Sequence, residues 1–235
     1  MPWDFVVILL VLGVVVPLHG RAKMRRLLAL PQISSLERLS LYASTIAFQW
    51  VIVALAAWRA WARGLGSAEL GTLIPDPQRI AIAAAAGALL VGAFQWFSLR
   101  RMGRVQRKPH GSFFHLAQLI LPRTEVEMLA YVALSLTAGL CEEFLYRGFA
   151  MAAFLRVGIP AWAVVLATAA LFGLAHLYQG RKGVITTLVL GIAFGAARIA
   201  YHSIVPVVVW HATIDLISGI LGSRYILRNS DGQTS

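Results

Sequence analysis

The sequence predicts an all-α fold, a polytopic transmembrane bundle of about seven or eight spanning helices. Hydrophobic residues make up 59% of its 235 residues and charged residues only 13%, whereas soluble globular chains carry about 25% charged residues. The mean hydropathy is +0.73. The apolar residues also gather into runs close to the ~20 residues that a helix needs to cross a bilayer. The length suits one bundle and leaves no room for a separate soluble domain.

Seven apolar runs are the expected spanning helices. They are residues 4–19, 39–60, 79–99, 126–146, 160–178, 183–200 and 203–222. The first run is slightly short, and the fourth is interrupted by a charged motif before it continues over 148–156. Pro160, Gly180 and Pro206 fall at or near joints, where a break in the helix costs least. A further helix over 113–121 would raise the number of spans to eight.

The chain divides into three expected regions. Residues 1–125 hold the N-terminal helices and a basic cytoplasmic loop, 126–222 form a catalytic helical core, and 223–235 are a short polar tail. Gly191 and Gly195 give one helix a surface of small residues, which lets a neighbouring helix of the same chain approach closely.

The positive charges predict how the chain lies in the membrane. The net charge is +11, and most of the 21 lysines and arginines fall on one side if the N-terminus is outside and the C-terminus cytoplasmic. The short loops and the absence of a basic signal segment favour a bacterial inner membrane. Basic residues placed this way contact lipid headgroups, and no nucleic-acid motif is present. The single cysteine, Cys141, excludes an internal disulfide.

Residues 140–148, LCEEFLYRG, place charge in the middle of an apolar run. A carboxylate at the bilayer centre costs about 2.5–3.5 kcal/mol even on the most lenient scale. Glu142 and Glu143 therefore need partners, a proton or a polar cavity. Glu143 and Arg147 are four residues apart on one helix face, with the glutamate first, which favours an ion pair. Glu142 points about 100° away from Glu143 and is expected to face a polar site.

Two later runs each present a polar face of their own. Phe172 and His176 are four residues apart, as are His211 and Asp215. Together with Glu142, three helices thus supply one carboxylate and two imidazoles. Such a set can bind a water, take its proton and stabilise the oxyanion that forms when water attacks a carbonyl.

Structural interpretations of the same residues stay open. Taken alone, His176 could be a satisfied core histidine, and His211 with Asp215 could be a hydrogen-bonded pair that locks two helices. No cofactor is firmly indicated. A zinc ion held by Glu142, His176 and His211 is left open, and a metal-free glutamate mechanism fits equally well. Cys141 is expected to serve packing.

The ordered motifs resemble a known family. Glu142-Glu143-x-x-x-Arg147, Phe172-x-x-x-His176 and His211-x-x-x-Asp215 are similar, in order and rough spacing, to the three motifs of the CAAX prenyl protease and bacteriocin-processing (Abi) family of intramembrane endopeptidases. The resemblance covers about residues 125–222.

The resemblance implies roles for individual residues. Glu142 would activate the water, His176 would help to hold it, and His211 with Asp215 would lie on the oxyanion side. Eukaryotic prenyl-protein proteases have asparagine where this chain has Asp215. An ionised aspartate would repel an oxyanion, so Asp215 would carry a proton, orient His211 or ligate a metal. Glu143, Arg147 and Phe172 would support the site.

Three functions remain under consideration from the sequence. The first is an intramembrane endopeptidase acting on a peptide or protein substrate, prenylated or embedded in the membrane. The second is a membrane proton relay or transporter, because chains of glutamate and histidine within bundles also carry protons. The third is a non-catalytic immunity or assembly partner that keeps the shape of the site.

Overall fold

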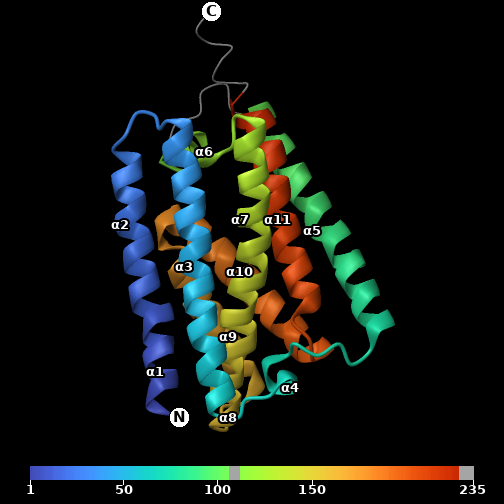
Figure 1. The fold of residues 1–235 in the computed structure, drawn as a ribbon. Helices are drawn as coiled ribbons and strands as arrows, with labels where there is room; N and C mark the ends of the chain where they lie inside the picture. The colour runs from blue at the N-terminus through green and yellow to red at the C-terminus, as the bar shows by residue number, and fades with distance from the viewer. Residues whose placement is uncertain (106–111, 228–235) are drawn as a thin grey trace, which may run out of the picture.

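The structure is a computed structural model that describes residues 1–105 and 112–227. Within these ranges the regular elements are all helices, and the long ones run roughly parallel or antiparallel as a bundle (Figure 1). The polar end of the expected tail, residues 228–235, lies outside the described residues, as does the centre of the expected basic loop, residues 106–111.

The helices follow one another through short connections. Their bounds are α1 Trp3–Leu10, η1 Val11–Val15, α2 Val16–Leu28, α3 Ser35–Ala62, α4 Ser67–Leu70, α5 Pro77–Val105, α6 Ser112–Ile120, α7 Glu125–Glu143, η2 Phe144–Ala150, α8 Met151–Arg156, α9 Ala161–Ala175, η3 Leu177–Gln179, α10 Gly180–Tyr201, α11 Val205–Gly222 and η4 Ser223–Leu227. The elements η1, η2 and η4 are π-helical turns that continue the neighbouring α-helices, and η3 is a 3₁₀ turn.

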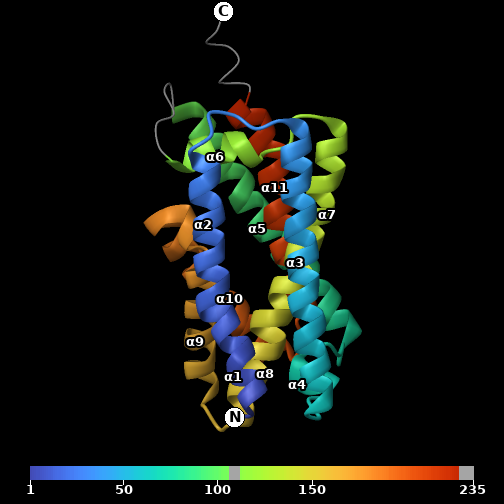
Figure 2. The same ribbon diagram turned by 60° about the vertical axis from the view of Figure 1, so that its left-hand side comes forward.

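The predicted polytopic helical bundle is confirmed. Among the described residues, six helical segments are long and apolar enough to cross a membrane. The remaining expected run, 160–178, forms the shorter apolar helix α9, of 15 residues. The expected eighth segment is α6, nine residues long, which lies across one end of the bundle (Figure 2).

Local sequence signals explain where the helices begin. Ser34 and Glu37 form a capping box at the start of α3, in which each side chain bonds the backbone N–H of the other residue. Thr124 caps α7 by accepting a hydrogen bond from the backbone N–H of Glu127. Pro77 and Pro206 occupy first-turn positions of α5 and α11, where the missing proline N–H has no helical partner to lose.

Ion pairs with buried carboxylates link helices at both ends of the bundle. Arg38 of α3 bonds Glu127 of α7 at 2.9 Å, and both side chains are almost fully buried. At the opposite end Asp4 of α1 accepts hydrogen bonds from Arg59 and Arg63 of α3. Carboxylates in this apolar chain are thus tied to neighbouring helices, as intramembrane charges usually are.

The span of α7, η2 and α8 places the charged motif in the middle of the bundle. It is one continuous helix of 32 residues, Glu125–Arg156. Glu142 therefore lies about 20 Å from the Arg156 end, at 1.5 Å per residue. Helix α9 starts from that same end and stops at Ala175, which brings His176 to a similar depth. Glu142 and His176 meet because the helix that carries Glu142 continues to Arg156, ten residues beyond the end of the run expected at 126–146.

Close contacts between small residues bring the helices of the site together. A Cβ on Gly139 of α7 would lie 3.0 Å from both the backbone nitrogen and the Cβ of Ala212 in α11. A Cβ on Gly191 of α10 would lie 3.0 Å from Ala169 of α9. Gly191 therefore packs against another helix of the same chain, as predicted.

Candidate active site

The charged motif lies where α7 passes into the π-helical turn η2. Glu142 and Glu143 are the last two residues of α7, and Arg147 lies inside η2. π-Helical turns are rare and frequently mark functional sites. The two glutamates point to different surroundings, because the side chain of Glu142 keeps 20% exposure and that of Glu143 has none.

Glu143 and Arg147 form the ion pair expected from their spacing. Arg147 Nη1 donates to Glu143 Oε1 at 2.9 Å, and both side chains are fully buried. Arg147 Nη2 also donates to the carbonyl of Gly191 at 3.3 Å. Its guanidinium lies 4.3 Å from the ring centre of Phe172 and 5.5 Å from that of Phe194. Phe172 thus provides cation–π support at the pair.

His211 joins this pair through a contact that helical spacing did not predict. Its Nδ1 lies 2.7 Å from Glu143 Oε1. A carboxylate only accepts, so Nδ1 carries the proton and donates it. Glu143 therefore receives hydrogen bonds from Arg147 and from His211 on one oxygen, and it fixes the imidazole across the α7–α11 contact. Spacing within one helix could not have revealed a bond between two helices.

His176 turns one ring nitrogen toward Glu142. Its Nδ1 donates to the carbonyl oxygen of Phe172 at 2.8 Å, which leaves Nε2 unprotonated in the neutral ring. Nε2 lies 3.9 Å from Glu142 Oε2. That separation is too long for a direct hydrogen bond and suits one bridging water.

Gln49 of α3 supplies a contact that the sequence analysis missed. Its Nε2 donates to Glu142 Oε1 at 2.8 Å. Its own Oε1 is buried and has no hydrogen-bond partner among the residues that the structure describes. One signal in the sequence could have found it, since Gln49 is a carboxamide in the middle of an apolar run, where polar side chains often bond across helices.

Asp215 lies near His211 without a hydrogen bond to it. Asp215 Oδ2 is 3.7 Å from His211 Nε2, and its side chain is 34% exposed, the most open of the site residues. The structure therefore brings all four sequence-predicted residues together. Glu142 is close to His176, and His211 is close to Asp215. Glu143 accepts a hydrogen bond from the other ring nitrogen of His211. Cys141 is fully buried.

The arrangement does not form a ready metal site. Among residues 1–105 and 112–227, no group of three or more histidines, cysteines, aspartates or glutamates is placed to hold one ion. The Nδ1 atoms of His176 and His211 both bond protein acceptors, which leaves each Nε2 free, as in a metal-bound histidine. In the described arrangement, however, Glu142, His176 and His211 are not placed together to hold the zinc ion that the sequence left open.

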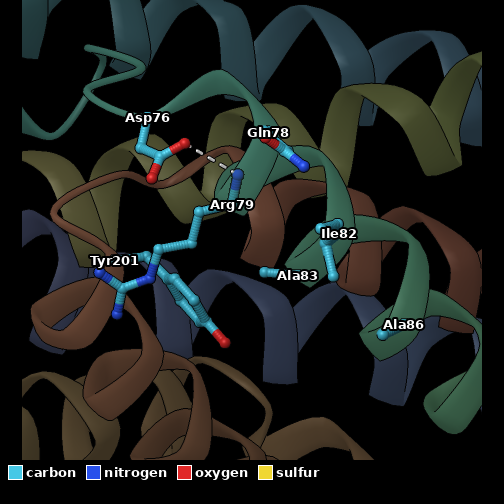
Figure 3. A pocket seen from close by; sticks show the side chains of 7 residues that line it. All are labelled: Asp76, Gln78, Arg79, Ile82, Ala83, Ala86 and Tyr201. Carbon is cyan, nitrogen blue, oxygen red and sulfur yellow. Dashed lines mark hydrogen bonds between the residues drawn. The ribbon is translucent and has the colours of Figure 1, made fainter.

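A separate hollow lies at the end of the bundle where α5 begins (Figure 3). Its volume is about 400 Å³, and Arg79 crosses it with its guanidinium 5.3 Å from the ring centre of Tyr201. Asp76 accepts a hydrogen bond from the backbone N–H of Arg79 at its rim. None of the sequence-predicted site residues lines this hollow.

Comparison with known families identifies the segment that carries this geometry. Residues 124–217 match the family described as Rce1-like, type II CAAX prenyl endopeptidase. No curated protein and no solved structure matched the chain. The matched segment holds the paired glutamates, both histidines and Asp215. Of the six long apolar segments among the described residues, three precede it and three lie within it or overlap its end. The chain is therefore an integral membrane protein whose residues 124–217 match the Rce1-like family of type II CAAX prenyl endopeptidases, a family of proteases.

Proposed function

We propose that the protein is an intramembrane endopeptidase in which Glu142 activates a water for attack on a peptide bond of a prenylated substrate. The observation that carries this proposal is the 3.9 Å approach of Glu142 Oε2 and His176 Nε2. Both atoms are acceptors when the glutamate is ionised and His176 is neutral, so a proton donor belongs between them. A water satisfies both atoms by donating one proton to each.

The second pair, His211 and Asp215, supplies the positive side of the site. With its Nδ1 bonded to Glu143, a protonated His211 presents Nε2–H toward the more exposed part of the site. Asp215 faces that same nitrogen and acts as a counter-charge for the imidazolium. An N–H group held in this way can stabilise an oxyanion in a site that excludes bulk water.

The reaction follows from these positions. The water oxygen forms a bond to the carbonyl carbon while its proton passes to Glu142, and the carbonyl oxygen becomes an oxyanion that accepts from His211. As the tetrahedral intermediate collapses, the C–N bond breaks. The proton on Glu142 moves to the leaving amine. The products are a carboxylate on one fragment and an amino group on the other.

The proposed orientation places the end with α6 and the start of α7 in the cytoplasm and the N-terminus outside a bacterial inner membrane. Arg21, Arg25 and Arg26 lie in α2 near the proposed cytoplasmic end, and Arg123 precedes α7 there. Clusters of this kind favour the cytoplasmic face. A substrate anchored by its own lipid would reach Glu142 from this side.

The direct test is cleavage of farnesylated peptides by purified protein in lipid nanodiscs. Glu142→Gln should lower kcat by at least about 10³-fold, because the amide cannot take the proton from water. Glu125→Gln is the matched control, since Glu125 is an exposed glutamate on the same helix, and its activity should equal that of the wild type. A chelator should leave cleavage unchanged.

Two outcomes would contradict the proposal. Cleavage that survives Glu142→Gln would remove Glu142 from the chemistry. Absence of cleavage, together with proton uptake into liposomes that depends on Glu142, would favour the relay instead.

A further inference from the structure

Lys23 of α2 directs its ammonium group across the bundle to α3. Its Nζ donates to Ser44 Oγ at 3.1 Å and to Thr45 Oγ1 at 3.4 Å. Lysines in membrane helices usually extend along the helix toward the headgroups. This lysine instead reaches sideways to two hydroxyl groups of the neighbouring helix.

The charge of Lys23 has no carboxylate to balance it in the part of the chain that the structure describes. Arg38, Arg59 and Arg147 each lie within ion-pair distance of a carboxylate. Lys23 is bonded to neutral hydroxyls, and these two bonds occupy two of its three N–H donors. The third donor is free for an acceptor that is not part of the described chain.

The two hydroxyls are oriented to accept from Lys23. Ser44 Oγ and Thr45 Oγ1 both donate to the carbonyl oxygen of Leu41, at 3.0 and 2.7 Å. Their protons are thereby committed to the backbone, and their lone pairs remain for the ammonium. The group is a prepared cationic position between α2 and α3.

The position of Lys23 is in register with the proposed catalytic site. Thr45 and Gln49 are four residues apart and share a face of α3, so they lie about 6 Å apart along its axis. Gln49 in turn donates to Glu142 at 2.8 Å. A chain lying along α3 from Glu142 would therefore reach Lys23 one helical turn farther on.

We propose that Lys23 binds the C-terminal carboxylate of the substrate and so measures the distance from that end to the bond that is cut. This inference rests on the proposed function. A CAAX motif is C-terminal, with three residues after the prenylated cysteine. Three extended residues span about 10 Å, which matches one helical turn plus a hydrogen bond at each end. A lone cation bonded to neutral hydroxyls suits a carboxylate through a charge-assisted hydrogen bond.

The test compares two farnesylated CAAX peptides that differ only at the C-terminus, a free carboxylate in one and a carboxamide in the other. The wild type should cleave the acid with a kcat/KM about ten-fold or more above that of the amide, because a charged acceptor is replaced by a neutral one. Equal kcat/KM values for the two peptides would overturn the proposal without any variant.

Substitutions then assign the preference to one residue. Lys23→Met should bring the acid-to-amide ratio of kcat/KM to about one, whereas Lys23→Arg should keep a preference for the acid. The control is Arg26→Met, because Arg26 is an exposed cation on the same helix, and its ratio should equal that of the wild type. A ratio that Lys23→Met leaves intact would refute the assignment.

Binding measurements separate this inference from the proposed catalysis. Both peptides are titrated into the Glu142→Gln variant, with and without Lys23→Met, and their Kd values are compared. Tighter binding of the acid that disappears with Lys23→Met would support the carboxylate site even if no peptide is cut. Equal affinities for acid and amide would count against it even if cleavage by Glu142 is established.

Discussion

At the scale of single residues, Gln49 gives the two oxygens of Glu142 different surroundings. Oε1 accepts the carboxamide N–H at 2.8 Å, while Oε2 faces His176 at 3.9 Å. A carboxylate anchored at one oxygen holds the other in a fixed direction, as a general base requires. Gln49 lies on α3, outside the matched segment 124–217, so the N-terminal helices take part in the proposed site.

Replacing Gln49 with methionine tests whether this hydrogen bond to Glu142 Oε1 is needed for catalysis. The side chain keeps its approximate size and loses the hydrogen bond to Glu142. A hydrogen bond to a charged group contributes about 1.5–3 kcal/mol, so kcat should fall about 10–100-fold while KM changes little. Steady-state kinetics with the farnesylated acid peptide measure both constants.

Gln95 provides the matched control for Gln49. Its Nε2 donates to Ser218 at the same 2.8 Å, from α5 to α11. Gln95→Met should lower thermal stability to a similar degree and leave kcat unchanged. Equal losses of kcat in the two variants would mean that Gln49 acts through stability alone.

The residues that the sequence identified share one property. Glu142, His176, His211 and Asp215 are ionisable groups in an apolar chain, where their cost makes them conspicuous. Gln49 is neutral, so placing it in the membrane costs less free energy than placing a charge there. A single carboxamide in an apolar run is therefore a weaker sign of a functional site. The bond from His211 to Glu143 depends on which helices pack together, and a sequence pattern within one helix carries no such information.

At the scale of elements, the contact between α7 and α11 sets the proposed site. Gly139 lies one turn before Glu143, and Ala212 follows His211 directly. The absence of a side chain on Gly139 lets the two helices approach until a Cβ there would lie 3.0 Å from the Ala212 backbone nitrogen. The 2.7 Å bond between Glu143 and His211 forms across this same approach.

A methyl group at Gly139 should therefore push α7 and α11 apart at the proposed site. Gly139→Ala places a Cβ against backbone, which cannot rotate away, so α7 and α11 must move apart. Overpacking of this kind costs about 1–3 kcal/mol, and we expect kcat to fall at least about ten-fold as His211 leaves Glu143. Thermal unfolding and peptide cleavage report the two effects.

The control for this contact is Gly173→Ala. It adds the same methyl group between α9 and α10, where the nearest atom is Leu188 Cβ at 3.4 Å, an ordinary contact. Both substitutions raise helix propensity by the same amount. A difference between the two variants in stability or kcat therefore comes from the packing around the added methyl group. Full activity in Gly139→Ala would show that the close approach is not needed.

Element lengths were predicted less well than element positions. All seven apolar runs are helical, because hydropathy reports burial in lipid or protein directly. The run at 160–178 was expected to be a full span, yet α9 ends at Ala175. The next residue, His176, donates a hydrogen bond from Nδ1 to the carbonyl oxygen of Phe172. Hydropathy could not locate this end, since a helix that stops inside a bundle is as apolar as one that crosses it.

At the scale of the whole molecule, the two ends of the bundle differ in how they carry charge. At the end where the chain begins, Arg59 and Arg63 are paired with Asp4. At the opposite end, Arg21, Arg25 and Arg26 are carried by the exposed last turns of α2, and His176 and Glu142 lie between the two ends. The more positive end of the bundle, at the last turns of α2, is therefore also the end from which the C-terminal carboxylate of a substrate would approach Lys23.

This asymmetry predicts the orientation of the chain, and single cysteines can test it. Cys141 is the only cysteine and is fully buried, so Cys141→Ala supplies a background without reactive thiols. Ser67 is exposed in α4, at the N-terminal end, and Glu125 is exposed at the start of α7, at the other end (Figure 1). In intact cells a membrane-impermeant maleimide should label Ser67→Cys and leave Glu125→Cys unlabelled.

Permeabilised cells complete the experiment, because both cysteines should then react and any difference in intrinsic reactivity becomes measurable. The reverse pattern in intact cells would place the arginines of α2 outside, against the preference of basic segments for the cytoplasm. It would also turn the Lys23 position away from any substrate whose C-terminus is cytoplasmic. The labelling pattern thus decides from which side of the membrane a carboxylate can approach Lys23 and Glu142.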